Sequence, residues 1–348
     1  MNSPDPHLQQ VAASCIHRSM GWPNSDHFQN GRFFTPHAPQ QPGFRAMLEW
    51  LTHREKTAWQ KWISTPRGTP PPERLAVGEL RVTFVNHATV LLQIGELNVI
   101  TDPIWSNRAS PVQFAGPRRH RAPGIRFEDL PPIDVVLLSH NHYDHLDTRT
   151  LRRLKRRDAP TIYCPLGVAA RLRRLGFHSI VELDWWQHQP FREVVIHGVP
   201  AQHFSARGLF DRNRTLWCGW QIEYANGGIL FAGDTGFGPH FSEIAARFPA
   251  PRLALLPIGA YRPRWFMGPV HMGPEEALEA HAILKPLMSM PIHYGTFSLA
   301  DDGESEPVDH LRSLLADRPE QAWRVLQEGE GWMLPTLTVS SVLSSTRD

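Results

Sequence analysis

The segment LLSHNHYDHLD, residues 137–147, places three histidines and two aspartates directly after an apolar stretch. A buried core would be destabilised by so many titratable groups unless their charges were compensated, and a solvated His-rich turn would not need them. His140 and His142 are two residues apart, so on an extended strand their side chains would point to the same side and could bind one ion. Asp144 and His145 follow where the chain leaves the strand and could reach a second ion. Imidazole and carboxylate suit zinc, and also manganese or iron, so the segment predicts a metal site.

Three further candidate ligands also follow apolar, strand-like stretches. They are His203 in VPAQHFSARG, Asp234 in GILFAGDTGFG and His293 in MPIHYGTF. Each of them alone would fit a buried, hydrogen-bonded side chain. In this order behind a HxHxDH motif they support one another, and the glycines around Asp234 allow close approach of the backbone.

The composition is that of a folded enzyme-sized chain. It has 348 residues, 41% of them hydrophobic, and a net charge of +2, so we expect a packed core and no nucleic-acid partner. Three scattered cysteines fit neither a disulfide framework nor a Cys-based zinc site and favour a cytoplasmic protein. We read neither a membrane span nor a signal peptide in the sequence. The oligomeric state is left open.

The periodicity predicts an N-terminal arm with an amphipathic helix over residues 1–72 and a mixed domain over residues 73–348. The arm is rich in Pro, Asn, His and Gln up to residue 43, and apolar residues recur at helical spacing over 44–63. Strands and helices alternate beyond residue 73, which indicates an α/β or α+β class. We expect strands at 80–84, 89–94, 98–101, 135–138, 161–164, 194–199, 217–224, 228–232 and 253–257, and helices at 150–157, 167–175 and 274–284.

Taken together, SHNHYDHLD, AQHFS, FAGDTG and PIHYGTF resemble the metal motifs of the metallo-β-lactamase superfamily of two-metal hydrolases. More narrowly, residues 81–300 resemble the N-acyl-phosphatidylethanolamine-hydrolysing phospholipase D family. The strings that carry this resemblance are NHATVLLQ, TDPIWSNRASPVQFAGPRR, LPPIDVVLLSHNHYDHLD, ELDWWQ, RGLFDRNRTLW, PIGAYRPRWFM, HMGPEEA and HYGTFSLA.

The resemblance implies an αββα sandwich in which every metal ligand lies at one edge. It implies two zinc ions, with a hydroxide between them that attacks the substrate, and assigns the ligands in three sets: His140, His142 and His203 for one ion, Asp144, His145 and His293 for the other, and Asp234 for both.

The resemblance also implies roles for four residues around the metals. Asp144 would orient the hydroxide, and His271 would contact substrate or donate a proton, with a helix-capping role as the alternative. Val270 stands before His271 where the mammalian pattern has glutamine. Tyr143 would contact lipid, or else pack in the core, and Asp102 would orient a ligand histidine. His87 in NHATV could do likewise, but we favour a structural role for it.

The function implied is a phospholipase D-type phosphodiesterase that cleaves N-acyl-phosphatidylethanolamine to N-acylethanolamine and phosphatidic acid. The alternatives are a soluble hydrolase of a lactone or small cyclic phosphodiester, and a metal-bound scaffold without turnover. No GxSxG nucleophile elbow is present.

Peripheral contact with the inner membrane face is a further hypothesis. It depends on Trp59 and Trp62 sharing one face of the 44–63 helix, although both could instead pack on the sandwich. Basic clusters at 118–121, 152–157 and 171–174 are either solvated faces or lipid contacts. Four aromatic residues either line an acyl-chain groove or belong to the core: Trp185, Trp186, Trp265 and Phe266.

Overall fold

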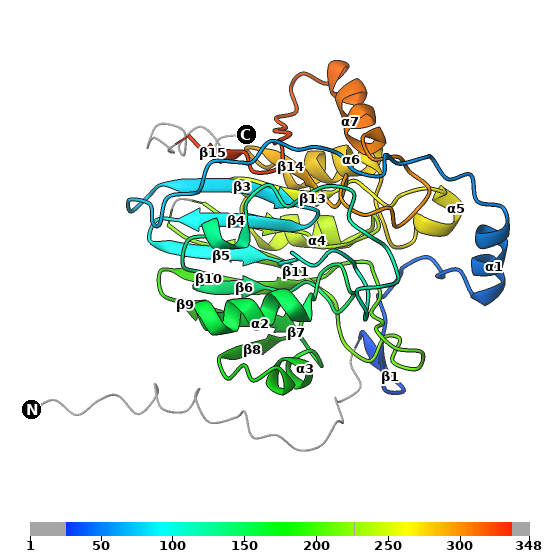
Figure 1. The fold of residues 1–348 in the computed structure, drawn as a ribbon, viewed down its shortest axis with the longest axis horizontal. Coiled ribbons are helices and arrows are strands. Elements are labelled where there is room, and N and C mark those ends of the chain that lie inside the picture. The colour runs from blue at the N-terminus through cyan, green and yellow to red at the C-terminus, as the bar shows by residue number, and fades with distance from the viewer. Residues whose placement is uncertain (1–25, 226, 336–348) are drawn as a thin grey trace, which may run out of the picture.

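The computed structural model describes residues 26–225 and 227–335, and its centre is two β-sheets packed face to face (Figure 1). One sheet has the strand order β15 (Gly331–Met333), β3 (Leu80–Asn86), β4 (Thr89–Ile94), β5 (Leu97–Thr101), β6 (Val135–Leu137), β7 (Thr161–Pro165), β8 (Ile180–Leu183). The other has the order β14 (Ser289–Ile292), β13 (Leu253–Pro257), β12 (Ile229–Phe231), β11 (Gly219–Glu223), β10 (Val194–Val199), β9 (His188–Phe191).

Helices cover the outer face of each sheet. The seven-stranded sheet is covered by α2 (Thr148–Arg157) and α3 (Ala169–Arg174), and the six-stranded sheet by α4 (His240–Arg247), α6 (Pro274–Leu284) and α7 (Glu306–Ala316). Short elements complete the described chain: β1 (Phe28–Gln29), β2 (Arg32–Phe33), α1 (Phe44–Thr52), the 3-10 turn η2 (Phe127–Asp129) and α5 (Arg264–Met267). The fold is the αββα sandwich that the resemblance implied.

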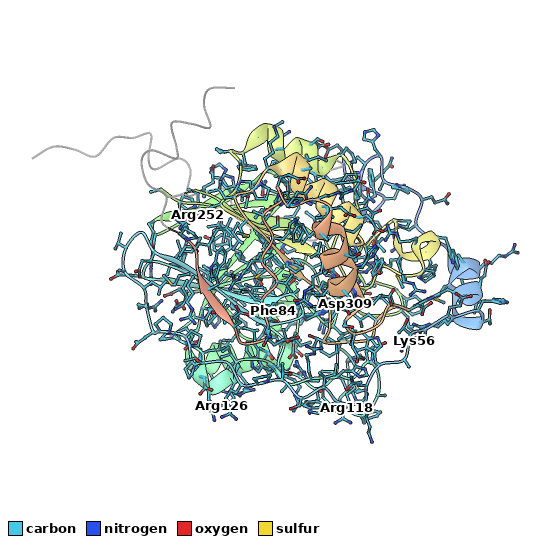
Figure 2. All side chains as sticks on the ribbon, turned by 90° about the horizontal axis from the view of Figure 1, so that it is seen from above. Lys56, Phe84, Arg118, Arg126, Arg252 and Asp309 are labelled. Atoms are coloured by element: carbon cyan, nitrogen blue, oxygen red, sulfur yellow. The ribbon has the colours of Figure 1, made fainter. Side chains whose placement is uncertain are left out.

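The hydrophobic core has three layers, which explains why β6 is wholly apolar. Val135 and Leu137 face the second sheet, whereas Val136 packs with Leu151 and Leu154 of α2 on the opposite side. A strand buried on both faces has no position at which a polar side chain could reach water. Figure 2 shows Phe84 in the middle of the molecule, with Lys56, Arg118 and Arg126 at its periphery.

Strand direction brings the metal motifs together. β5 and β6 are parallel neighbours, as are β12, β13 and β14, and β10 runs in the same direction as β12 because both are antiparallel to β11. The carboxyl ends of β5 and β6 therefore share one edge of their sheet, and those of β10, β12 and β14 share one edge of the other. The segments that leave these ends carry Asp102, the HxHxDH motif, His203, Asp234 and His293.

The expected strands and helices beyond residue 73 are all present. Four of them, β4, β10, β13 and α6, have the expected bounds, and the others have shifted ends. Sequence periodicity missed β8, β9, β14 and β15, and the helices α4, α5 and α7. The division between residues 72 and 73 stays a prediction. Phe28 and Phe33 of the β1–β2 hairpin are buried in the core between the sheets, so residues 26–33 pack on the sandwich.

The helix expected over residues 44–63 is wrong beyond Thr52. α1 ends there, and the next residues bond to distant backbone: the Thr57 amide donates to Asp301 O and the Ile63 amide to His120 O. Trp59 and Trp62 therefore do not share a helix face. The Trp59 indole donates to Asp302 O at 2.8 Å, so this residue packs on the sandwich, whereas Trp62 is 49% exposed.

The other sequence-based expectations have mixed outcomes. Trp185 is buried and donates to Trp217 O, which supports the core interpretation for this residue, while Trp265 is exposed. Cys164 and Cys218 are buried free thiols, and Cys15 lies outside the described residues. In the part of the chain that the structure describes, no helix is both long and apolar enough to cross a bilayer.

We predict that truncation of Phe84 and of Phe44 to alanine will have very different effects on the free energy of unfolding. Phe84 is 1% exposed and stacks on Tyr294, so Phe84→Ala should cost about 3–5 kcal/mol through lost burial and a cavity. Phe44, on α1, is 69% exposed, and Phe44→Ala should stay within about 0.5 kcal/mol of the parent protein. Denaturant titration at fixed zinc concentration measures both, and similar losses would contradict the exposure of α1.

Candidate metal centre

One group of imidazoles converges at the end of β6. His140 Nε2 lies 2.7 Å from His142 Nδ1, which in turn is 3.3 Å from His203 Nε2. His140 and His142 lie in the loop after β6, not on the strand as the sequence argument assumed. They converge because the chain turns here, with the Leu146 amide donating to His142 O. These three nitrogens could hold one metal ion.

The outward nitrogens of two of these rings are already occupied. Ser139 Oγ donates to Asp102, so it accepts from His140 Nδ1 at 2.9 Å, and His203 Nδ1 donates to Val270 O at 2.9 Å. Each bond fixes the tautomer and leaves Nε2 with a free lone pair directed at the centre. Burial lowers the pKa of His203 to about 3 and that of His142 to about 4, so both rings are neutral, ligand-ready bases at neutral pH.

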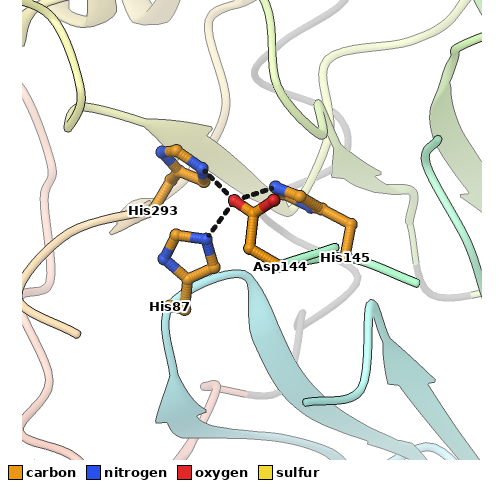
Figure 3. Close-up of side chains that lie close together, drawn as sticks. All are labelled: His87, Asp144, His145 and His293. Atoms are coloured by element: carbon orange, nitrogen blue, oxygen red, sulfur yellow. Dashed lines mark hydrogen bonds and ion pairs between the residues drawn. The ribbon is translucent and has the colours of Figure 1, made fainter. Parts of the chain in front are cut away.

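A second group surrounds the Asp144 carboxylate (Figure 3). Asp144 Oδ2 lies 3.1 Å from His145 Nε2 and 3.4 Å from His293 Nε2. Asp234 lies between the two groups, with Oδ2 at 3.1 Å from both His145 Nε2 and His293 Nε2, 3.8 Å from His203 Nε2 and 4.0 Å from His140 Nε2. One carboxylate oxygen thus faces ligands of both groups, as a bridging ligand must.

His87 has a role that the sequence did not reveal. It follows β3, is 1% exposed, and its Nε2 donates to Asp144 Oδ2 at 2.9 Å (Figure 3). Together with Asp144, His145 and His293 it forms a set that could hold one ion. Burial and the nearby His293 lower the pKa of His87 to about 3, so a neutral ring orients the carboxylate. We expected a structural histidine here, with an orienting role as the alternative, because NHATV by itself does not show which carboxylate the ring meets.

Asp102 closes β5 and holds two parts of the metal loop. It accepts hydrogen bonds from the Ser139 amide at 2.8 Å and from His145 Nδ1 at 2.7 Å. The second bond turns His145 Nε2 toward Asp144 and Asp234. This geometry agrees with the orienting role that the resemblance implied for Asp102, on a residue that is fully buried.

The site carries buried negative charge that metal cations could compensate. Asp102, Asp144 and Asp234 are all buried, and buried carboxylates require compensation. Burial alone would lower the pKa of His293, but Asp234 and Asp144 raise it to about 9, so protons supply the balancing charge when no metal is bound. His145 Nε2 contacts Asp144 and Asp234 without an aligned hydrogen bond, and Asp234 Oδ1 is buried without a hydrogen-bond partner. The donor set of imidazole and carboxylate suits zinc, manganese or iron.

His271 faces the site, whereas Tyr143 has other contacts. One ring nitrogen of His271 lies within 4.8 Å of ligand atoms of His203 and Asp234, and its Nδ1 is buried without a hydrogen-bond partner. Burial keeps the pKa of His271 well below its usual value, so the ring is neutral.

The Tyr143 hydroxyl donates to Arg207 O, and its ring packs beside Ile104 and Phe297. Its contact with lipid stays a prediction.

Arg207 was not found from the sequence. Its Nη1 donates to three backbone carbonyls of the metal loop, Asn141 O at 2.7 Å, His142 O at 3.2 Å and Leu146 O at 2.9 Å, and its guanidinium lies 3.9 Å above the Tyr143 ring. One side chain thereby fixes the turn that carries His142, Asp144 and His145. An arginine that donates to backbone carbonyls has no sequence motif, because every residue provides a carbonyl.

Comparison with known proteins agrees with this geometry. A family model described as a beta-lactamase superfamily domain matches residues 97–294. An N-acyl-phosphatidylethanolamine-hydrolyzing phospholipase D 1 of Caenorhabditis elegans is 34% identical over 335 residues, which cover 89% of this chain and 93% of that protein. The chain belongs to this family within the beta-lactamase superfamily. It is a metal-dependent hydrolase.

Two further comparisons extend this assignment. An uncharacterised protein of Mycobacterium tuberculosis is 42% identical over 279 residues, covering 79% of this chain and 74% of its own length. A crystal structure of an isothiocyanate hydrolase from Delia radicum gut bacteria superimposes with a TM-score of 0.59 at 22% identity, over 74% of this chain and all of that one. At that identity the likeness concerns the fold alone.

We predict that Asp234→Asn will weaken metal binding by at least about 100-fold, beyond the effect of losing a residue that merely orients a ligand. The amide removes the charge that faces both groups. Asp134→Asn is the matched control, because the Asp134 side chain is only 8% exposed but lies at the other end of β6, paired with Arg74. Elemental analysis after dialysis against a weak chelator measures how much metal each variant retains. Equal retention by the two variants would remove Asp234 from the ligand set.

Proposed function

We propose that the protein is a two-zinc phosphodiesterase that hydrolyses N-acyl-phosphatidylethanolamine to N-acylethanolamine and phosphatidic acid. The observation that carries this proposal is the match over 93% of the length of the Caenorhabditis elegans phospholipase, whose name states that activity. A relative in Saccharomyces cerevisiae with a name of the same kind is 35% identical over 225 residues, although these cover only 48% of that protein.

In this proposal His140, His142 and His203 hold one zinc ion, Asp144, His145 and His293 hold the other, and Asp234 contacts both. The convergence of these side chains and their compensated charges support the assignment. When bound, two such ions supply a water of lowered pKa and neutralise the charge of a phosphodiester. Manganese or iron would suit the same donors.

The remaining roles fall to Asp144 and His271. Asp144 is held by His87 Nε2, so its carboxylate is oriented and can accept a hydrogen bond from the attacking water. His271 is neutral and has a ring nitrogen with no protein partner. We assign it to the leaving oxygen of the substrate, as a hydrogen-bond donor.

A lipid substrate places the enzyme at a membrane surface, and α1 is the part of the chain best suited to contact it. α1 has no buried residue, and Phe44, Leu48 and Leu51 are 69%, 45% and 50% exposed. Beside it, Trp265 of α5 is 52% exposed, and Figure 1 shows α1 projecting beyond α5. α1 is held by Trp50, which stacks on Phe266 of α5, and its other large apolar side chains stay exposed. Such an exposed apolar face is typical of interfacial binding. A position on the cytoplasmic side of the membrane stays a prediction from the cysteine content.

We predict that protein purified without chelator will contain about two equivalents of metal and will hydrolyse N-acyl-phosphatidylethanolamine in mixed micelles. A panel that also includes a lactone and a small cyclic phosphodiester tests the alternative. Turnover of these soluble substrates without lipid turnover would replace the lipid assignment by that of a soluble hydrolase. A metal-free protein with full activity would contradict the mechanism itself.

We predict that His271→Ala will retain its metal content and lose about 10²–10³-fold in kcat, the usual cost of removing one hydrogen-bond donor to an oxygen that develops negative charge. His310→Ala is a control on the exposed side of α7, where His310 pairs with Glu275. Normal turnover in His271→Ala would leave this residue with a structural role. Loss of one metal equivalent would instead make it a ligand.

A further inference from the structure

A cavity of about 440 Å³ lies next to the metal loop but contains none of the seven candidate ligands. Tyr143 and Leu146 form one wall, the start of α2 forms another, and the loop around Phe114 closes it. The cavity and the candidate metal centre therefore share no residue. A group bound in the cavity would be held by side chains other than those assigned to the metals.

Three arginines line this cavity: Arg149, Arg152 and Arg207. Among the described residues, the side chains of Arg149 and Arg152 have neither a hydrogen bond nor an ion pair, and Arg207 Nε is buried without a partner. Burial, followed by the positive charge of the nearby Arg171, lowers the pKa of Arg207 to about 10, which leaves it cationic at neutral pH.

The cavity is lined by a single carboxylate, that of Asp147, and its oxygens are already engaged. They accept from the Ser106 amide and hydroxyl, from the Arg149 amide and from the Thr150 hydroxyl. Asp147 thus caps α2 and offsets only part of the positive charge. The guanidinium forks match the oxygens of a phosphate group, which can accept from several donors at once.

Exposed apolar side chains surround these arginines. Phe114 lines the cavity and is 84% exposed, and Leu209 and Phe210, just after Arg207, are 92% and 83% exposed. A bilayer with anionic head groups binds proteins through exposed apolar side chains, which insert into it, and through nearby cationic side chains, which it attracts. A soluble anion would gain nothing from these apolar tips.

We propose that this cavity binds the phosphate group of an anionic phospholipid, distinct from the substrate, and so anchors the enzyme on the bilayer. The inference rests on the proposed function only in taking a bilayer as the place of work. It also divides the basic cluster at 152–157, because Arg152 lines the cavity and Arg156 does not, and it leaves the cluster at 171–174 outside the lining.

The test is sedimentation with vesicles of phosphatidylcholine, with and without a minor fraction of phosphatidylglycerol. Neither lipid is N-acylated, so binding is measured without reference to turnover of the proposed substrate. The variant is Arg149→Gln/Arg152→Gln, and the control is Lys285→Gln/Arg318→Gln, which removes the same charge just beyond α6 and α7, outside the cavity lining. Calorimetric titration with inorganic phosphate forms a separate arm.

We expect the cavity variant to bind anionic vesicles about 30-fold more weakly than the parent protein, and the control to stay within about threefold. The melting temperature and hydrolysis of a soluble phosphodiester should not change. Equal losses in both variants would overturn the proposal in favour of diffuse charge attraction, and unchanged binding in both would overturn it outright. Phosphate binding that disappears in the cavity variant while vesicle binding persists would make the cavity a site for a soluble anion.

Discussion

The structure depends on the compensation of three buried carboxylates. Asp102, Asp144 and Asp234 lie together at the edge of the sandwich, where isolated negative charge would be prohibitively costly. His145 contacts all three, and without metal it must carry a proton, as must His293. Cations can replace both protons, because they provide the same charge to the same oxygens. The histidine-rich loop lies at the ends of these strands, and hydrogen bonds orient its side chains. Together they place positive groups next to the three carboxylates.

The sandwich topology brings the three carboxylates and the histidines that compensate them together from distant parts of the chain. His140 and His293 are separated by more than 150 residues, yet both follow strands that end at the same edge. His293 is held there by its amide, which donates to His87 O, and His87 in turn holds Asp144. The two sheets are thus joined at the metal site by a backbone bond as well as by side chains.

The sequence predicted the features that local chemistry determines. Every candidate ligand follows an apolar stretch, and a donor at the end of a buried strand is visible without tertiary information. His87 and Arg207 could not be assigned, because their partners are a carboxylate and three carbonyls far away in the sequence. The predicted C-terminal end of the helix that begins at Phe44 was wrong for the same reason. The apolar spacing continues to Ile63, but residues after Thr52 bond to distant backbone that periodicity cannot register.

Val270 shows how the metal site and substrate choice are separated in this chain. The residue differs in type from the mammalian pattern, but what His203 uses is its carbonyl oxygen, which any residue provides. Its side chain is 6% exposed and lies beside His271 in sequence, on the way from α5 to α6. A change at this position therefore leaves the tautomer of His203 and the metal ligands untouched. It alters the apolar surroundings of His271, the residue that we propose for the leaving group, without a change to the metal centre.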